Sequence, residues 1–229
     1  DSVLRESSGE IWLDAKHTEK SAIYDYTRSY HKYNEPLRGI EYGTEKFKGV
    51  GKTDLDAGYQ HNGKNLNALT DLLEKSELPQ DQWFQRGCGY KNMDKFFACT
   101  DDLLRYGTQE ELEKELLGKT VTEYGFMSMG SAKGQGFDGN ILMNIYAPRG
   151  TKAMYVEPIS AYGAELHQSG WGSGLKWDGV KKQSSFGTEL ETLLQQNTDF
   201  RITKIERKGN TLYFDLEIIA QNELQRWKP

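Results

Sequence analysis

The stretch Phe186-Gly187-Thr188-Glu189-Leu190-Glu191 places two carboxylates two residues apart, at the start of an apolar run and just after a glycine-rich loop. On an extended strand, residues i and i+2 project toward the same face, roughly 6.5–7 Å apart, so Glu189 and Glu191 can reach one bound substrate. This spacing permits paired acid chemistry. Because most Glu-x-Glu pairs form a solvated strand face, a catalytic interpretation requires other groups that converge on the pair.

The composition predicts a single globular domain over residues 1–229. With 36% hydrophobic and 12% aromatic residues, the chain can bury a sizeable core. The net charge of −5 argues against a nucleic-acid partner. No apolar stretch approaches the roughly 18–20 residues of a membrane span, and the start at Asp1 without a signal-like segment predicts a processed chain.

The chain contains two cysteines, Cys88 and Cys99. Neither has histidine or cysteine neighbours at the spacing of metal ligands, so we expect no metal site. A disulfide between the two and a pair of buried free thiols both remain open, because the sequence does not reveal how closely their Cβ atoms approach.

The first part of the chain, residues 1–118, is predicted to be rich in helices. Apolar residues recur every three or four positions in several segments, and Thr108-x-x-Glu111 forms a capping box in front of a leucine-bearing segment that Gly118 ends. The expected helices cover 19–33, 65–76, 93–106 and 108–117, with a short strand over 82–85.

The second part, residues 119–229, changes to short apolar runs separated by glycine and proline, which predicts mainly β structure. Lys208-Gly209-Asn210 supplies turn chemistry between two alternating runs and predicts a terminal hairpin. The expected strands cover 122–128, 141–146, 153–156, 189–194, 200–206 and 211–219. Helices followed by an antiparallel sheet predict an α+β domain.

Four segments, in this order, resemble the motifs of bacterial arginine-directed mono-ADP-ribosyltransferases, particularly the catalytic domains of actin-modifying binary toxins. The segments are the helical stretch 24–38, Trp83-Phe84-Gln85-Arg86-Gly87, Gly125-Phe126-Met127-Ser128-Met129-Gly130-Ser131, and 186–194 with its Glu-x-Glu pair. The resemblance runs from about residue 19 to about residue 219. It implies the ADP-ribosyltransferase-like fold, with a helical N-terminal half packed on a two-sheet antiparallel β core.

The resemblance also implies a site for NAD as co-substrate. Arg86 would hold the pyrophosphate through charge-assisted hydrogen bonds, and the Gly87 backbone would approach the nicotinamide amide. Phe137 would cover the nicotinamide ring, although a phenylalanine among glycines can equally anchor a loop. The other residues that would contact NAD are Tyr26, Tyr30, Asn34 and Ser128.

The implied catalytic group is Glu191, which would stabilise the positive charge that builds on the ribose when the nicotinamide bond breaks. Ser128 would orient this carboxylate. Glu189 would position and help deprotonate the acceptor guanidinium, and Phe186 would lie in the turn that recognises the acceptor. In the family, a glutamate at the position of Glu189 accompanies arginine modification, and a glutamine accompanies other acceptors.

The sequence departs from the family pattern at two places. Met129 and Gly130 replace the second and third residues of a Ser-Thr-Ser motif, so only the first hydroxyl, that of Ser128, is retained. Asp138 and Asn140 stand where related toxins carry a basic residue, which can shift a phosphate contact to Arg38. Two alternatives therefore stay open: an NAD glycohydrolase of the same fold and a catalytically silent binding module.

The partners that the resemblance implies are NAD and a protein modified on arginine, for which actin is one candidate. It also implies a protein that is secreted or delivered into a host cell, with a separate delivery component as one route.

Overall fold

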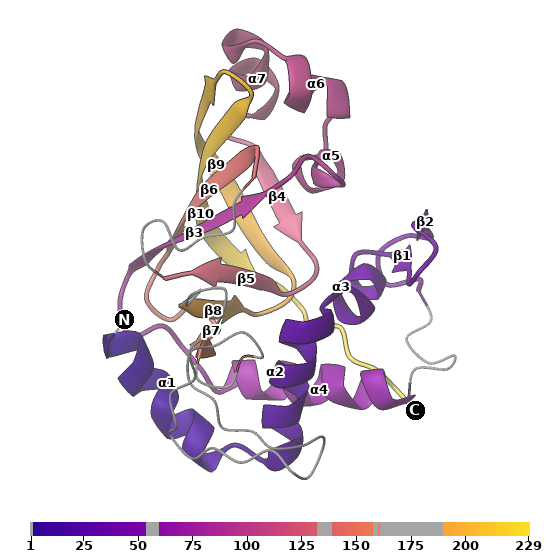
Figure 1. The fold of residues 1–229 in the computed structure, drawn as a ribbon, viewed down its shortest axis with the longest axis vertical. Coiled ribbons are helices and arrows are strands. Elements are labelled where there is room, and N and C mark those ends of the chain that lie inside the picture. Colours follow the sequence, from indigo (N-terminus) through magenta and orange to yellow (C-terminus); the bar gives the residue numbers. More distant parts are fainter. Residues whose placement is uncertain (1, 54–59, 132–138, 158–159, 161–189) are drawn as a thin grey trace.

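The computed structural model describes residues 2–53, 60–131, 139–157, 160 and 190–229 (Figure 1). Its helices lie mostly before residue 118 and its longer strands mostly after it, in agreement with the α+β expectation. The helices are α1 (Ser2–Asp14), α2 (His17–Ser29), α3 (His31–Leu37), α4 (Gln60–Glu74), α5 (Met93–Phe97), α6 (Asp101–Tyr106) and α7 (Gln109–Leu116).

The main differences from the expected helices lie where the backbone breaks. The predicted helix over 93–106 is two helices, because Ala98 adopts a left-handed conformation with φ of 51° and the Thr100 hydroxyl caps α6. The predicted helix over 19–33 is divided between α2 and α3 at Tyr30. The capping box of Thr108 and Glu111 is confirmed at the start of α7.

The strands form a two-stranded sheet and an eight-stranded sheet in the order β4-β9-β10-β6-β3-β5-β8-β7. The terminal hairpin is confirmed as β9 and β10. The strands are β1 (Ile40–Glu41), β2 (Lys46–Phe47), β3 (Gln82–Cys88), β4 (Thr120–Glu123), β5 (Met127–Gly130), β6 (Ile141–Ala147), β7 (Ala153–Tyr155), β8 (Glu191–Leu194), β9 (Thr198–Lys208) and β10 (Thr211–Gln221).

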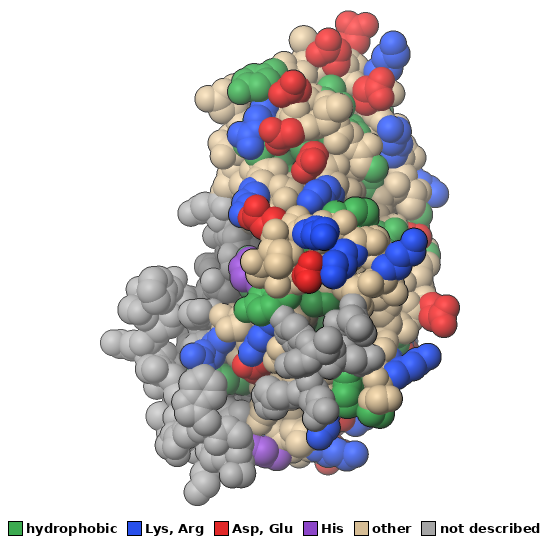
Figure 2. Space-filling view, turned by 90° about the vertical axis from the view of Figure 1, so that its right-hand side faces the viewer, with side chains coloured by type: hydrophobic (Ala, Val, Ile, Leu, Met, Phe, Trp, Pro, Cys, Tyr) green, Lys and Arg blue, Asp and Glu red, His purple; other side chains and the backbone are tan. Residues whose placement is uncertain are grey.

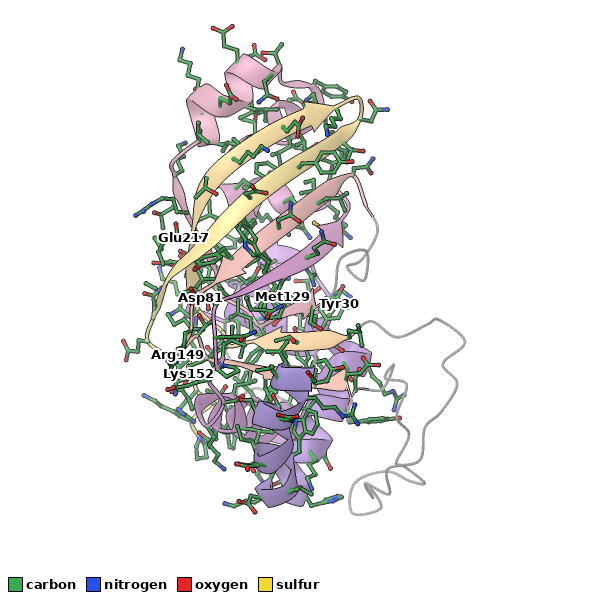
Figure 3. The ribbon with its side chains drawn as sticks, turned by 90° about the vertical axis from the view of Figure 1, so that its left-hand side faces the viewer. Tyr30, Asp81, Met129, Arg149, Lys152 and Glu217 are labelled. Atoms are coloured by element: carbon green, nitrogen blue, oxygen red, sulfur yellow. The ribbon has the colours of Figure 1, made fainter. Side chains whose placement is uncertain are left out.

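The large sheet has two parts that meet at one residue pair. Strands β9, β10, β6 and β3 lie side by side in Figure 3, whereas β3 pairs with β5 only at Gln85 and Gly130. Beyond this junction lie the short strands β5, β8 and β7. One detail departs from the expected antiparallel core: β10 is antiparallel to β9 but runs parallel to β6, its other neighbour.

Aliphatic and aromatic side chains form a core that packs against both parts of the sheet. Along β6, Ile141, Met143 and Ile145 are buried, and the residues between them are partly exposed, as the period of two requires. Phe97 of α5 stacks on Phe214 of β10, with ring centroids 4.3 Å apart. Helices α1, α2 and α4 lie beside β7 and β8 in Figure 1, whereas α6 and α7 lie at the other end of the molecule.

The C-terminal segment after β10 runs back along α4. The backbone of Trp227 exchanges two hydrogen bonds of 2.9 Å with the side chain of Asn67, and the side chain of Gln225 donates to the carbonyl oxygen of Leu37 at the end of α3. The indole ring of Trp227 lies directly over Gly63. The tail therefore joins α3 and α4. No helix among the described residues is long and apolar enough to cross a membrane.

Replacement of Gly63 tests this contact, because an added Cβ would lie 2.2 Å from Cγ of Trp227. We expect Gly63→Ala to displace the indole and lower the free energy of unfolding by about 1–3 kcal/mol. Gly9→Ala in α1 is the matched control: its Cβ meets nothing within 4 Å, so it should raise stability by about 0.5–1 kcal/mol. Urea unfolding measures both, and equal stabilisation by the two changes would show that the tail is not docked on α4.

Candidate active site

Three residues from separate stretches meet where β3, β5 and β8 adjoin. The Arg86 guanidinium donates through Nη1 to the carbonyl oxygen of Ser128, with a distance of 2.7 Å. The Ser128 hydroxyl donates to Oε1 of Glu191, also at 2.7 Å. Because Gly130 pairs with Glu191 across the ladder, Ser128 is the diagonal neighbour of Glu191 on the same sheet face. The structure thus brings together Arg86, Ser128 and Glu191.

A second serine holds the other oxygen of the same carboxylate. Ser160 donates its hydroxyl to Oε2 of Glu191 at 2.9 Å, and its own backbone N–H donates to the carbonyl oxygen of Val156. The Glu191 side chain is only 4% exposed, so both of its oxygens depend on protein donors or on a ligand. Buried Glu157 accepts a 3.4 Å hydrogen bond from the backbone N–H of Glu191.

The sequence analysis missed Ser160, although the sequence contains a signal for it. Residues 160–167, Ser-Ala-Tyr-Gly-Ala-Glu-Leu-His, repeat the pattern of residues 184–191, Ser-Ser-Phe-Gly-Thr-Glu-Leu-Glu. A comparison of the chain with itself would have marked Ser160 as the first residue of a copy of the Glu-x-Glu segment.

The backbone just before Glu191 adopts an unusual conformation. Leu190 has φ of 45°, a left-handed conformation that costs a branched residue about 1–2 kcal/mol. Ser131 stabilises it, because its backbone N–H and its hydroxyl both donate to the Leu190 carbonyl oxygen, at 3.1 and 2.6 Å. Ser131 thus supplies a hydroxyl three residues after Ser128, although Met129 and Gly130 between them have none.

A cavity of about 690 Å³ opens beside Arg86. Its walls include Tyr30 and Arg38, and it reaches Met127, the residue before Ser128. Ser128 and Glu191 lie beyond its described walls. Figure 3 labels Tyr30 and Met129 at the same height of the molecule, where the two parts of the sheet adjoin. The other lining residues come mainly from α3, β1, β2, β4, α5, the C-terminal end of β3 and the loop that follows it.

The charges in this cavity have both signs. Arg38 is paired with Glu123, whose Oε1 lies 2.7 Å from Nε and also accepts from the backbone N–H of Gly125. Arg86, Lys91 and Lys95 add further positive charge, and Glu35 and Glu45 add negative charge. Figure 2 views the side that carries β1, β2 and α5 and shows acidic and basic side chains interspersed over it. Two guanidinium groups in one cavity are suited to a pyrophosphate.

Tyr26 and Asn34 are at most 2% exposed and do not line this cavity. The Asn34 amide exchanges hydrogen bonds of 2.9 and 3.0 Å with the backbone of Phe126, and the Tyr26 hydroxyl donates to the Phe126 carbonyl oxygen. Burial raises the pKa of Tyr26, although the positive charges of Arg86 and Arg38 act in the opposite direction. Tyr26 and Asn34 thus hold Phe126, the residue before β5, in position, whereas Tyr30 lines the cavity.

Of the remaining predicted site residues, the structure describes only Gly87. Gly87 is buried in β3 between Arg86 and Cys88, which both line the cavity. Glu189, Phe186 and Phe137 lie outside the described residues. In the described part of the chain, no group of three or more His, Cys, Asp or Glu side chains could hold a metal ion.

Cys88 and Cys99 are free thiols, so the disulfide is excluded, and both are partly rather than fully buried. Burial raises the pKa of both, to about 11 for Cys99. The thiolate is the nucleophilic form, so burial makes both residues less reactive at neutral pH.

Alkylation measures this effect. We expect both thiols of the native protein to react with iodoacetamide much more slowly at pH 8 than they do in urea, and the rate at Cys99 to rise about tenfold per pH unit toward its pKa of about 11. Peptide mass spectrometry quantifies each site. A requirement for reductant, or a rate at Cys99 that levels off below pH 9, would contradict the free, partly buried thiols.

Comparison with known proteins gives a family. The family described as ADP-ribosyltransferase exoenzyme matches residues 7–221. Mono-ADP-ribosyltransferase C3 of Hathewaya limosa is 27% identical over an alignment of 154 residues, which covers 65% of this chain and 57% of that protein. The matched stretch thus spans little more than half of the relative.

Solved structures share the fold. C3stau2 from S. aureus, solved with NAD, superimposes with a TM-score of 0.65 at 17% identity and covers 95% of each chain. BECa, an ADP-ribosylating toxin of a binary enterotoxin of C. perfringens, solved with NADH, gives a TM-score of 0.62 at 16% identity, over 94% of this chain and 46% of that chain. At these identities the likeness concerns the fold.

Proposed function

The chain belongs to the ADP-ribosyltransferase exoenzyme family, and from this premise we propose that it transfers ADP-ribose from NAD to an arginine side chain of a protein and releases nicotinamide. The observation that carries the proposal is the Glu191 carboxylate, which is held by the Ser128 hydroxyl, while the Ser128 carbonyl oxygen accepts from Arg86 in the wall of a cavity. We take residues 1–229 to act as a single catalytic domain.

In this proposal NAD binds across the cavity. Arg86, assisted by Arg38, neutralises the pyrophosphate, since guanidinium groups match phosphate oxygens in charge and geometry. Tyr30 faces the same cavity and supplies an aromatic surface. Tyr26 and Asn34, which do not line the cavity, act by fixing Phe126. The Gly87 backbone and the Phe137 ring are proposed to contact the nicotinamide end.

The chemical step breaks the bond between the ribose C1′ and the nicotinamide nitrogen, and the bonding electrons leave with neutral nicotinamide. Positive charge then builds on C1′ and the ring oxygen. Glu191 stabilises this charge as an acceptor for the neighbouring ribose hydroxyl, as carboxylates do in glycoside hydrolysis. Ser128 keeps the carboxylate oriented without taking part in bond breaking.

The acceptor is a guanidinium group, which must lose a proton to become a nucleophile. Glu189 is the proposed base, two residues before Glu191, and Phe186 is the proposed contact for the acceptor protein. Attack by the neutral guanidine nitrogen on C1′ completes the transfer. Support for arginine comes from the Glu-x-Glu spacing of the sequence. The relatives described as toxins support secretion and action on a host-cell protein, with actin as one candidate and a separate component as one delivery route.

The two glutamates should separate cleavage from transfer. We expect Glu191→Gln to lower both NAD cleavage and ADP-ribosylation by about 10²–10³-fold, because the amide lacks the charge that stabilises the ribose cation. Glu189→Gln should leave slow NAD hydrolysis and remove transfer to arginine. Nicotinamide release and incorporation of labelled ADP-ribose into agmatine or polyarginine measure the two activities.

Glu110→Gln, an exposed change on α7, is the control and should match the wild type. Cleavage that survives in Glu191→Gln would overturn the role of Glu191. Hydrolysis without transfer in the wild type would favour a glycohydrolase, and the absence of heat on calorimetric titration with NAD would indicate a silent binding module.

Arg86 provides a test of NAD binding. Arg86→Lys keeps the charge but loses the forked donors that can reach both a phosphate and the Ser128 carbonyl oxygen. We expect the KM for NAD to rise about tenfold, with a smaller fall in kcat. Arg201→Lys, an exposed change on β9, is the matched control. An unchanged KM in Arg86→Lys would remove the residue from the binding site.

A further inference from the structure

We propose that Ser160 is a positioning residue that holds the second oxygen of Glu191 and keeps this carboxyl group ionised. The inference deepens the proposed function, on which its catalytic consequence rests. The motif that carries the family resemblance contains Ser128 but not Ser160, which lies after β7 in a different part of the chain.

The contacts of Ser160 form a closed loop of three hydrogen bonds. The Val156 backbone N–H donates to the Glu191 carbonyl oxygen at 2.9 Å, and the Ser160 N–H donates to the Val156 carbonyl oxygen at 2.8 Å. The Ser160 hydroxyl then returns to Oε2 of Glu191 at 2.9 Å. Because two of these bonds involve the backbone, they set the position of the hydroxyl, and Ser160 is itself only 4% exposed.

The two serines hold the carboxylate from opposite sides. Ser128 on β5 donates to Oε1 and Ser160 after β7 donates to Oε2, so each oxygen accepts a hydrogen bond from a serine. A carboxylate oxygen can accept more than one hydrogen bond, so a substrate hydroxyl can still bind. The side chain is thereby fixed in rotation while it remains an acceptor.

The two serine donors stabilise the charged form of Glu191 in surroundings that otherwise disfavour it. Glu191 is almost fully buried, and Glu157, also buried, approaches its backbone after β7. Burial and a second carboxylate both favour the neutral acid. Arg86 on β3 opposes them, whereas Tyr26 on α2 stays uncharged because burial raises its pKa. Hydrogen bonds donated to the charged form of a carboxyl group lower its pKa. The Ser160 hydroxyl donates such a bond to Glu191, as the Ser128 hydroxyl does.

The test uses the full chain and does not need enzymatic activity. Glutamate labelled with ¹³C at the side-chain carboxyl gives NMR signals that titrate, and loss of one signal in Glu191→Gln assigns that of Glu191. We expect Ser160→Ala to raise the midpoint of this titration by about one pH unit. Ser160→Thr, which keeps the hydroxyl, should restore it. Ser76→Ala is the matched control, because Ser76 is a buried serine that donates to the Ala153 carbonyl oxygen.

Kinetics supply the second measurement. The acidic limb of the pH profile of kcat for NAD cleavage should move upward with the NMR midpoint in Ser160→Ala, and the KM for NAD should stay within about twofold. A residue with a merely structural role would lower stability without moving this limb. Ser160→Cys, similar in volume but a weaker donor, provides a second variant if Ser160→Ala folds poorly.

Two outcomes would overturn the proposal. One is an unchanged Glu191 midpoint in both Ser160→Ala and Ser160→Cys. The other is a midpoint that moves in Ser184→Ala instead, since Ser184 occupies the equivalent place in the repeated segment. Failure of the proposed function looks different: the wild type would not cleave NAD, while the titration of Glu191 could still be measured in every variant.

Discussion

The site depends on the single residue pair that joins the two parts of the sheet. Strands β3 and β5 are linked in the ladder only at Gln85 and Gly130, so little backbone pairing fixes the angle between them. The hydrogen bond from Arg86 to the Ser128 carbonyl oxygen crosses the same junction. One guanidinium therefore serves the fold by joining the strands and, as we propose, also serves NAD binding.

Buried polar groups that do not line the cavity hold the backbone of the site in position. Asn34 and Tyr26 hold Phe126 at the entry to β5, and Ser131 holds Leu190 in its left-handed conformation at the entry to β8. A strained residue persists only where its surroundings determine its conformation. Ser128 and Glu191 follow Phe126 and Leu190 closely in sequence, so these supports set the positions from which the hydroxyl and the carboxylate meet.

Much of this arrangement could be predicted from short-range signals. The capping box at Thr108, the terminal hairpin and the α+β order follow from local patterns, and the motif resemblance identified Arg86, Ser128 and Glu191 before their contacts were known. The break at Ala98 was missed because a left-handed alanine has no sequence signature. The Arg38–Glu123 pair was missed because it joins residues 85 apart in sequence. Ser160 was missed because its signal is the similarity of residues 160–167 to residues 184–191, which a search for motifs does not detect. Glu189, Phe186 and Phe137 remain predictions.

The central claim is that one NAD molecule contacts the guanidinium groups in the cavity and the carboxylate held by the serines. A crystal structure of the Glu191→Gln variant with intact NAD tests it most directly. The account predicts the phosphates beside Arg86 and Arg38 and the nicotinamide ribose beside residue 191. NAD bound with its ribose remote from residue 191, or with its phosphates remote from both arginines, would contradict it.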